Sequence, residues 1–180
     1  MRPLLILDLD ETLIYGSESR LHLDADFLVG PFHVYMRPHL EGFLRDTAEH
    51  YDLAIWSSAS WGYVHAIADQ LLPLVPKWQF VWSRSRCVSR MDPELMEVGF
   101  LKDLRKVKRL GRDLARVLIV DDSPQKVSRN YGNAIYIPRF EGDDADDALP
   151  PLARFVSSLR SEADFRSIEK RGWRNSQHLR

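Results

Sequence analysis

The sequence predicts an α/β fold in which a Rossmann-like parallel sheet is flanked by helices. Three short apolar segments each run into polar residues, and amphipathic helical patterns lie between them. A continuous apolar run is typical of a strand buried on both faces, and strands that alternate with helices indicate parallel βαβ units. Because ligands bind beyond the carboxyl ends of such strands, we expect the polar segments to meet at one edge of the sheet.

Each predicted strand ends in a different polar segment. Residues 3–7 run into Asp8, residues 53–56 into the serine pair 57–58, and residues 117–120 into the aspartate pair 121–122. Between the strands, apolar residues recur at three- and four-residue spacing, which predicts helices. These residues are Leu40, Phe43 and Leu44; Val64, Ile67, Ala68, Leu71 and Leu72; and Leu152, Phe155, Val156 and Leu159.

Residues 14–36 separate the first predicted strand from the first predicted helix. Residues 32–36 alternate between apolar and polar types, which is typical of a strand. We therefore expect a short β-hairpin flap over residues 14–36, since the segment is too short for a separate cap domain.

The length and composition fit one globular domain. A chain of 180 residues can bury a substantial core, and 44% hydrophobic with 28% charged residues excludes a disordered or fibrous chain. We assign residues 1–160 to the domain and residues 161–180 to a C-terminal helix and basic tail.

Several classes of protein are excluded or left open by the composition. Cys87 is the only cysteine, which excludes a disulfide scaffold and a cysteine-rich metal site. No apolar run is long enough to cross a membrane, so we expect a cytoplasmic protein, or a nuclear one in a eukaryotic cell. The net charge of −1 gives no global basic field, yet local patches leave a nucleic-acid partner open. The sequence does not determine the oligomeric state.

Asp8 and Asp10 are the first candidate catalytic residues. Residues two apart in an extended segment point to the same side, so both carboxylates can face one site. Covalent phosphoryl transfer needs a carboxylate nucleophile, a separate acid/base and a cation, and this pair can supply the first two. The alternative is that the pair closes the strand and, with Thr12, caps the next turn.

The other polar segments each have two interpretations. The adjacent acids Asp121 and Asp122 repel each other unless they share a cation such as Mg²⁺, although Ser123 and Pro124 also fit the start of a helix. Ser57 can donate to a phosphoryl oxygen or cap a helix. The same ambiguity applies to Lys102, which lies among apolar residues and either neutralises a nucleophile and phosphate or is simply solvated.

The motifs together resemble a known family. Residues 8–13, DLDETL, resemble the DxDx[TV] signature of the haloacid dehalogenase superfamily of phosphotransferases. The ordered set is more narrowly similar to the NLI-interacting-factor domain, a family that contains phosphatases of the C-terminal repeats of RNA polymerase II. Further matching segments are MRP at 36–38, WSS at 56–58, SRSRCV at 83–88, KDL at 102–104, GRDL at 111–114 and VDDSP at 120–124. The resemblance covers residues 3–160 and implies a capless core.

The resemblance also implies a role for each matching residue. It makes Asp8 the nucleophile that becomes an aspartyl phosphate, and Asp10 the group that protonates the leaving alkoxide and then activates water. Thr12 would support the loop, Ser57 would be the hydroxyl of the second motif, and Lys102 the lysine of the third.

The resemblance further implies an Mg²⁺ site and substrate contacts. The ion would be held by Asp8, the backbone carbonyl of Asp10 and the side chain of Asp122, with Asp121 beside it. The substrate-binding set would be Ser57, Ser58, Arg84 and Lys102. Ser85 and Arg86 replace the usual Glu-Ser, and residues 89–98 and 105–110 depart from the family spacing.

We therefore expect an Mg²⁺-dependent phosphatase that hydrolyses phosphate monoesters through an aspartyl phosphate, with phosphoserine or phosphothreonine on a protein or peptide as substrate. The alternatives are a nucleic-acid-end or small-metabolite phosphatase of the same fold, a dehalogenase, and a catalytically silent protein-binding module. The presence of Asp8, Asp10 and Lys102 argues against the silent module. The lack of a large insert argues against the metabolite enzyme, which usually needs a lid. The aromatic residues Trp78, Phe80 and Trp82 would either form a substrate wall or pack in the core.

Overall fold

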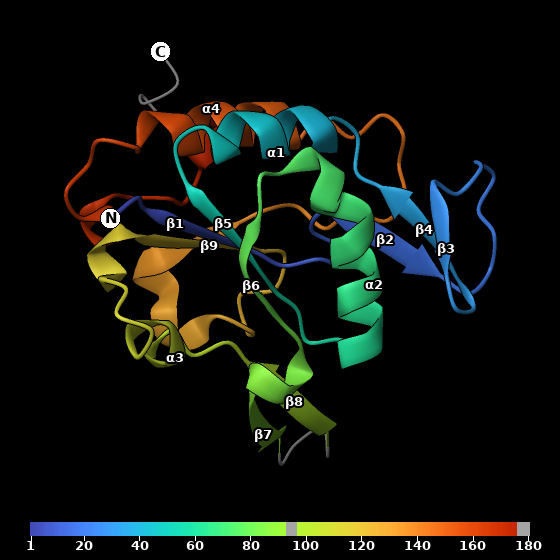
Figure 1. The fold of residues 1–180 in the computed structure, drawn as a ribbon, viewed down its shortest axis with the longest axis horizontal. Coiled ribbons are helices and arrows are strands. Elements are labelled where there is room, and N and C mark those ends of the chain that lie inside the picture. The colour runs from blue at the N-terminus through green and yellow to red at the C-terminus, as the bar shows by residue number, and fades with distance from the viewer. Residues whose placement is uncertain (93–96, 176–180) are drawn as a thin grey trace.

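The structure is a computed structural model, which describes residues 1–92 and 97–175. Its centre is a parallel sheet in the order β10-β9-β1-β5-β6 with helices packed against it (Figure 1), so the predicted α/β fold is confirmed. The strands of this sheet are β1 (Leu4–Leu7), β5 (Asp52–Trp56), β6 (Trp78–Trp82), β9 (Val117–Asp121) and β10 (Ala134–Tyr136). The helices are α1 (Leu40–Ala48), α2 (Trp61–Leu71), α3 (Arg105–Lys108) and α4 (Leu149–Ser158). No helix within the described ranges has the length and apolar composition needed to cross a membrane.

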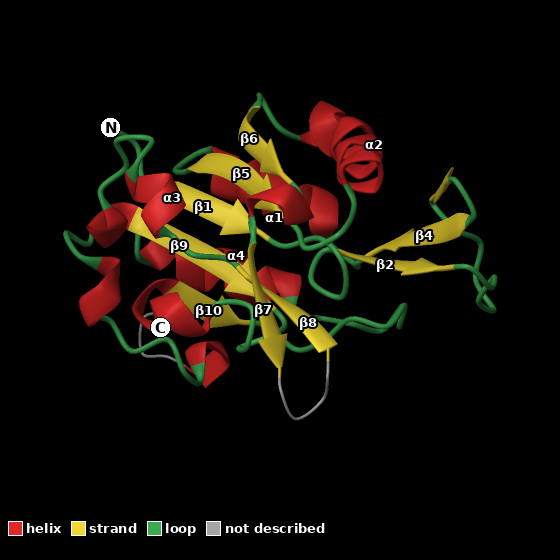
Figure 2. Cartoon of the chain, turned by 90° about the horizontal axis from the view of Figure 1, so that it is seen from below, coloured by secondary structure: helices red, strands yellow, loops and turns green. Residues whose placement is uncertain are grey.

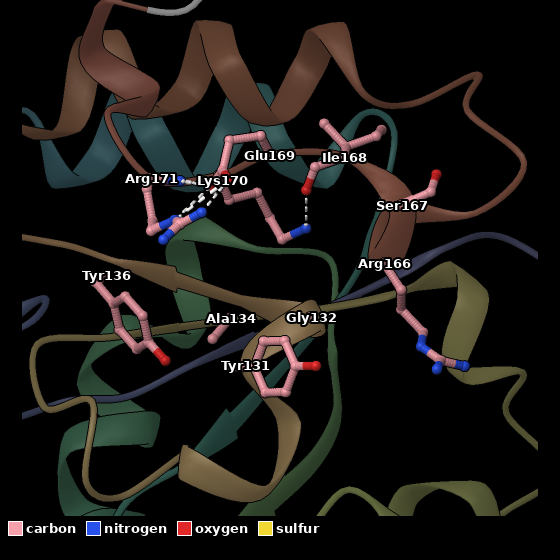
Figure 3. A pocket seen from close by; sticks show the side chains of 10 residues that line it. All are labelled: Tyr131, Gly132, Ala134, Tyr136, Arg166, Ser167, Ile168, Glu169, Lys170 and Arg171. Carbon is pink, nitrogen blue, oxygen red and sulfur yellow. Dashed lines mark hydrogen bonds and ion pairs between the residues drawn. The ribbon is translucent and has the colours of Figure 1, made fainter.

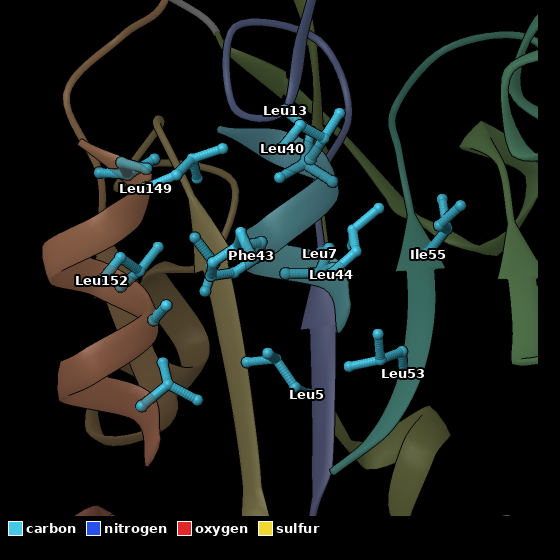
Figure 4. Packing of buried hydrophobic residues seen from close by; sticks show 14 of the residues in the cluster. Leu5, Leu7, Leu13, Leu40, Phe43, Leu44, Leu53, Ile55, Leu149 and Leu152 are labelled. Atoms are coloured by element: carbon cyan, nitrogen blue, oxygen red, sulfur yellow. The ribbon is translucent and has the colours of Figure 1, made fainter. Parts of the chain in front are cut away.

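Alternate residues of β1 pack on opposite faces of the sheet. Leu5 and Leu7 belong to a core with α1, α2 and α4, and Figure 4 shows both beside Phe43 of α1. Leu4 and Ile6 belong to a second core, to which α3 contributes. All four β1 side chains are completely buried, and full burial of one leucine contributes about 1.5–3 kcal/mol. This two-sided burial explains the uninterrupted apolar run.

The central position of β1 brings the three polar segments together. Leu7 lies opposite Ile55 of β5 and Val120 of β9. The Asp8 backbone N–H continues this ladder by donating to the Val120 carbonyl at 3.0 Å. The residues after the three strands therefore lie at one edge of the sheet, as the sequence predicts.

The flap is a small antiparallel sheet in the order β2-β4-β3, where the sequence predicts only a hairpin. Its strands are β2 (Ile14–Ser17), β3 (Phe27–Val29) and β4 (Phe32–Met36). Val29 pairs with Phe32 across a two-residue turn. Gly30 in that turn has a φ of 57°, a value that glycine adopts without steric cost. Figure 2 shows β2 and β4 extending sideways from the main sheet.

A second projection, β7 (Val88–Asp92) paired antiparallel with β8 (Glu97–Leu101), was not predicted as a hairpin. The sequence indicates this region only by a departure in spacing, and its residues 93–96 lie outside the described residues. Figure 2 shows β7 and β8 standing out from the body of the protein.

The expected C-terminal helix over residues 161–180 is not observed in its described part. Two short 3₁₀ turns, Phe165–Ser167 and Trp173–Asn175, take its place, and residues 176–180 lie outside the described residues. Phe165 and Trp173 are buried against the first core, and Gly172 between them has a φ of 68°, which interrupts a helix. This segment is attached to the first core by isolated aromatic side chains rather than by the apolar face of a helix.

Candidate active site

Three charged side chains meet at the carboxyl edge of β1 and β9. Lys102 Nζ lies 2.8 Å from Asp8 Oδ1 and 2.6 Å from Asp121 Oδ2, and none of these side chains is more than 1% exposed. The Lys102 backbone N–H donates to the Lys126 carbonyl at 2.7 Å, which fixes the lysine at this edge. Because an unpaired charge at this depth is strongly unfavourable, the Lys102 ammonium stabilises both carboxylates, which otherwise repel each other.

A second lysine contacts the other oxygen of Asp8. Lys126 Nζ lies 3.1 Å from Asp8 Oδ2 and 3.7 Å from Asp122 Oδ1. Burial raises the pKa of Asp8, but the charges of Lys102 and Lys126 outweigh it, so the pKa lies below the usual aspartate value. Asp8 is therefore ionised at neutral pH, as a nucleophile must be.

Asp10 lies in a different environment from Asp8. Burial, and next the charge of Asp8, raise its pKa, while a hydrogen bond from the Tyr63 hydroxyl to Asp10 Oδ1 at 2.8 Å opposes the rise. Gly16 allows this contact, because a Cβ atom at that position would overlap the Tyr63 hydroxyl. Neighbouring carboxyl groups whose pKa values shift in opposite directions are suited to separate nucleophilic and acid roles.

The loop that carries Asp10 and Thr12 is tied to its surroundings. The Asp122 backbone N–H donates to Thr12 Oγ1 at 3.1 Å, which connects this loop to the one after β9. Glu11 between them has a φ of 58°, an uncommon value for a residue with a Cβ. The Phe140 backbone N–H donates to the Glu11 carbonyl at 2.8 Å and so holds this conformation.

The acidic side of the site has the donor atoms that a hard cation requires. Asp8, Asp121 and Asp122 present carboxylate oxygens that all lie within 4.8 Å of one another. Asp121 uses one oxygen for Lys102 and the other to accept the Ser123 backbone N–H at 2.9 Å. Asp122 Oδ1, in contrast, is buried and accepts no hydrogen bond from the described residues. This oxygen set fits Mg²⁺, and Asp122 has the unsatisfied ligand atom.

Ser57 and Ser58 come directly after β5 at the same edge. Ser57 is buried, its backbone N–H donates to the Trp82 carbonyl at 2.9 Å, and its Oγ accepts the Ala59 N–H at 3.0 Å. No described residue accepts a hydrogen bond from the Ser57 hydroxyl, which leaves its proton for a phosphoryl oxygen. The residue that immediately precedes α2 is Ser60, so Ser57 is not the helix N-cap.

Arg84 lies beside the serine loop and makes no contact with the lysine–aspartate cluster among the described residues. Its Nε donates to the Ser58 carbonyl at 2.7 Å, and its guanidinium carbon lies 4.9 Å from the centre of the Phe100 ring. Arg84 therefore connects the serine loop to β8.

The aromatic residues of β6 contribute to packing. Trp82 is buried, meets Trp56 edge-on at 4.9 Å between ring centres and stacks on Phe80 at 4.1 Å. Trp78 packs against the first core, and its indole N–H donates to the Ala68 carbonyl at 3.2 Å. Of the two interpretations of these aromatics, core packing is the one observed.

Two residues of the site were missed from the sequence. Lys126 comes four residues after Asp122, a spacing that could have indicated it. Tyr63 carried no such signal, because its hydroxyl reaches Asp10 across 53 residues of sequence.

A cavity of about 470 Å³ lies elsewhere, between β10 and residues 166–171 (Figure 3). None of the predicted site residues lines it. Lys170 donates to the Phe165 and Ile168 carbonyls, and Arg171 is paired with Glu169. Lys170 and Arg171 are thus already bonded, and none of the predicted catalytic carboxylates lies in this cavity, so we place the candidate active site at the strand ends.

Comparison with known proteins decides the family. Residues 3–166 match the family described as NLI interacting factor-like phosphatase. The chain belongs to this family. The predicted family and the prediction of a phosphoric monoester hydrolase are thereby confirmed.

Individual relatives agree with this assignment. CTD nuclear envelope phosphatase 1 of Xenopus laevis is 31% identical over 186 residues, which cover 94% of this phosphatase and 72% of the relative. The human carboxy-terminal domain RNA polymerase II polypeptide A small phosphatase 1 is 30% identical over 171 residues. These residues cover 91% of this chain and 61% of the relative.

The solved structures agree in fold. Fission yeast Fcp1, an RNA polymerase II CTD phosphatase, superimposes with a TM-score of 0.59 at 21% identity over 88% of this chain and 45% of the Fcp1 chain. A haloacid dehalogenase-like hydrolase from Xanthomonas campestris gives a TM-score of 0.51 at 14% identity. The superposition covers 91% of this chain and 97% of the hydrolase chain.

Proposed function

We propose that the chain is an Mg²⁺-dependent phosphatase that hydrolyses phosphoserine or phosphothreonine on a protein through an aspartyl phosphate at Asp8. The observation that carries the proposal is the buried Asp8 carboxylate, whose oxygens lie 2.8 Å from Lys102 Nζ and 3.1 Å from Lys126 Nζ. A carboxylate that is kept ionised and oriented at the edge of the sheet is suited to attack phosphorus.

Asp10 carries both proton transfers in this mechanism. Its raised pKa favours the protonated acid, which gives its proton to the leaving alkoxide as Asp8 bonds to phosphorus and the ester P–O bond breaks. The Asp10 carboxylate then accepts a proton from the water that attacks the aspartyl phosphate. Inorganic phosphate leaves, and both carboxyl groups return to their starting states. Tyr63 keeps the Asp10 carboxyl group in position.

The residues that would hold Mg²⁺ are Asp8, the backbone carbonyl of Asp10 and the side chain of Asp122, with Asp121 beside them. The buried Asp122 Oδ1, which has no hydrogen-bond partner in the described part of the chain, supports Asp122 as the direct ligand. When bound, the ion offsets negative charge on the phosphoryl oxygens. Asp121 instead keeps the Lys102 ammonium against Asp8.

The remaining site residues bind the phosphoryl group or support the loops around it. Ser57, Ser58 and Lys102 contact the phosphoryl group in this proposal, and Thr12 supports the nucleophile loop through the Asp122 N–H. Arg84 positions the serine loop through the Ser58 carbonyl.

The substrate class is inferred from the relatives. The human relative is named as a small phosphatase of the RNA polymerase II carboxy-terminal domain, so we assign a phosphorylated protein or peptide to this chain by analogy. The Xenopus relative is named for the nuclear envelope. For this chain, the cytoplasmic location, or a nuclear one in a eukaryotic cell, stays a prediction.

The deciding experiment measures phosphate release from an aryl phosphate, a phosphoserine and phosphothreonine peptide panel, and a 5′-phosphorylated oligonucleotide. Each substrate is assayed with Mg²⁺ and with chelator. We expect Mg²⁺-dependent release from the aryl phosphate and the peptides. Release from the oligonucleotide alone would favour the nucleic-acid-end phosphatase, and no release from any substrate would favour the silent binding module.

A further inference from the structure

The cavity between β10 and residues 166–171 has no part in the proposed reaction, yet it has the size of a ligand site. Its volume of about 470 Å³ lies within the roughly 300–1,000 Å³ that is common for small-molecule pockets. One wall consists of β10 and the end of the 3₁₀ turn before it, and residues 166–171 form the other wall (Figure 3). The side chains on these two walls indicate what the cavity can bind.

The wall on the side of β10 has small residues in its middle and aromatic residues at its ends. Figure 3 shows Ala134 between the rings of Tyr131 and Tyr136. Gly132 also lines this wall and has no side chain to fill the space. Aromatic rings favour contact with the face or edge of another ring. This wall therefore suits a planar, largely apolar group.

The opposite wall contains a buried lysine whose charge is not balanced. Lys170 is 6% exposed, and its Nζ donates to the Phe165 carbonyl at 2.6 Å and to the Ile168 carbonyl at 2.7 Å. These carbonyls use two of the three ammonium donors but carry no net charge. Burial lowers the pKa of Lys170 more than the charges of Glu169 and Asp164 raise it. An anion in the cavity would balance the ammonium and accept its third N–H.

The rest of the cavity lining adds positive charge. The Arg166 guanidinium has no hydrogen-bond or ion-pair partner in the part of the chain that the structure describes. Arg171 lies 2.7 Å from Glu169 Oε2, so these two charges cancel. Arg166 and Lys170 therefore leave the cavity with a net positive charge, which favours an anionic ligand.

We propose that this cavity binds a small anion that carries a planar ring, such as an aromatic carboxylate or an aromatic phosphate. The ring would lie against Tyr131 and Tyr136, and the anionic group would accept a hydrogen bond from Lys170, with the charge of Arg166 nearby. An anion without a ring would leave the aromatic wall uncovered, and a neutral ring would leave the lysine charge unbalanced. The inference uses no residue of the proposed catalytic machinery, so it does not depend on the proposed function.

The first arm of the test measures binding to the wild-type protein by titration calorimetry in the presence of chelator. Phenylphosphonate and benzoate have both a ring and a charge, methylphosphonate has no ring, and benzamide has no charge. We expect at least one of the two ring anions to bind once per chain, about tenfold or more tightly than methylphosphonate and benzamide. The inference is overturned if neither ring anion binds more tightly than these two controls.

The second arm removes the buried charge. We expect Lys170→Met to weaken binding of the ring anion about tenfold, because a hydrogen bond to a charged group is lost. Lys106→Met is the matched control, since Lys106 Nζ also donates to two backbone carbonyls, those of Arg86 and Cys87, and lies outside the cavity. This control should bind as the wild type does. Equal affinities in the two variants would overturn the inference.

The third arm tests the aromatic wall and does not depend on the turn that Lys170 holds. Tyr131 is 78% exposed, so its replacement should leave the fold intact, which a melting curve checks. We expect Tyr131→Ala to weaken binding of the ring anion about fivefold and to leave that of methylphosphonate unchanged. Tyr131→Phe keeps the ring and should keep the affinity. Wild-type affinity in Tyr131→Ala would place the ligand outside this cavity and overturn the inference.

Discussion

Asp8 is held between two lysines that come from different parts of the chain, and both lower its pKa against the effect of burial. Asp8→Asn keeps the side-chain volume but removes the nucleophilic charge. We expect loss of turnover and of any acid-labile phosphoenzyme, with the fold retained. Phosphate release and the circular-dichroism melting curve check this prediction, with exposed Asp69→Asn as the control. Normal turnover in Asp8→Asn would contradict the covalent mechanism.

Lys126 contacts two of the carboxylates assigned to Mg²⁺, so its positive charge opposes the ion. Two unit charges 4 Å apart interact by about 4 kcal/mol near a protein surface, and screening by solvent reduces this further. We therefore expect Lys126→Met to tighten Mg²⁺ binding about tenfold. Titration calorimetry without substrate measures the affinity directly.

The matched control for this prediction is Lys108→Met, because Lys108 is exposed on α3. Its Mg²⁺ affinity should equal that of the wild type. Unchanged or weaker binding in Lys126→Met would show that Lys126 does not compete with the ion.

Between elements, the approach of β2 to α2 determines how Asp10 is held. Gly16→Ala would place a Cβ atom against the Tyr63 hydroxyl and displace it from Asp10. We expect a roughly tenfold loss in kcat that is largest for substrates with poor leaving groups, because these depend most on the acid. Tyr63→Phe should give the same dependence on the leaving group.

Gly62→Ala is the control for the glycine substitution. Gly62 lies in α2, and a Cβ atom there meets nothing within 4 Å. Alanine should leave catalysis unchanged and raise stability by about 0.4–1 kcal/mol. A loss in Gly16→Ala that is equal for good and poor leaving groups would contradict the role of Tyr63.

The burial of each element determines how far the sequence could predict it. The strands that carry Asp8, Ser57 and Asp121 are buried on both faces, and such strands leave a continuous apolar run. The β7–β8 hairpin lacks this signal, since its strands VSRMD and EVGFL contain no continuous apolar run and their Met91 and Val98 are exposed. Tyr63 and Lys126 reach the site through tertiary packing, which short motifs do not encode. In the described residues 161–175, 3₁₀ turns replace the expected C-terminal helix, because Phe165 and Trp173 are buried anchors without helical periodicity.

Over the whole molecule, stability should fall in acid. In the folded state, burial raises the pKa of Asp146, but the hydrogen bonds from Arg37 outweigh it and lower the pKa. Hydrogen bonds from Arg105 lower the pKa of Asp103. A carboxyl group whose pKa is lower in the folded state stabilises the fold fully at pH values above its unfolded pKa of about 3.9. This stabilisation is lost as the pH falls through the lower pKa of the folded state. We therefore expect the free energy of unfolding to decrease mainly below about pH 4.

Arg37→Met tests the contribution of one pair. The Arg37 side chain is fully buried and contacts Asp146, the Thr12 carbonyl and the Pro138 carbonyl. At pH 7 we expect a loss of about 3 kcal/mol, and at pH 3 a smaller loss, because Asp146 is then partly protonated. Urea unfolding at both pH values measures this difference. Equal losses would show that the ion pair contributes nothing beyond packing.

The central place of β1 in the sheet has a consequence for biosynthesis. The ribosome makes β1 before both of its neighbours, since Leu4 pairs with Asp52 on one side and with Val117 on the other. At about 5–20 residues per second, this strand spends several seconds without its second partner. Asp8 likewise meets Lys102, Asp121 and Lys126 only after these residues have been translated. Catalytic competence should therefore appear late in translation, and its recovery during refolding should coincide with the docking of β9 rather than with early collapse.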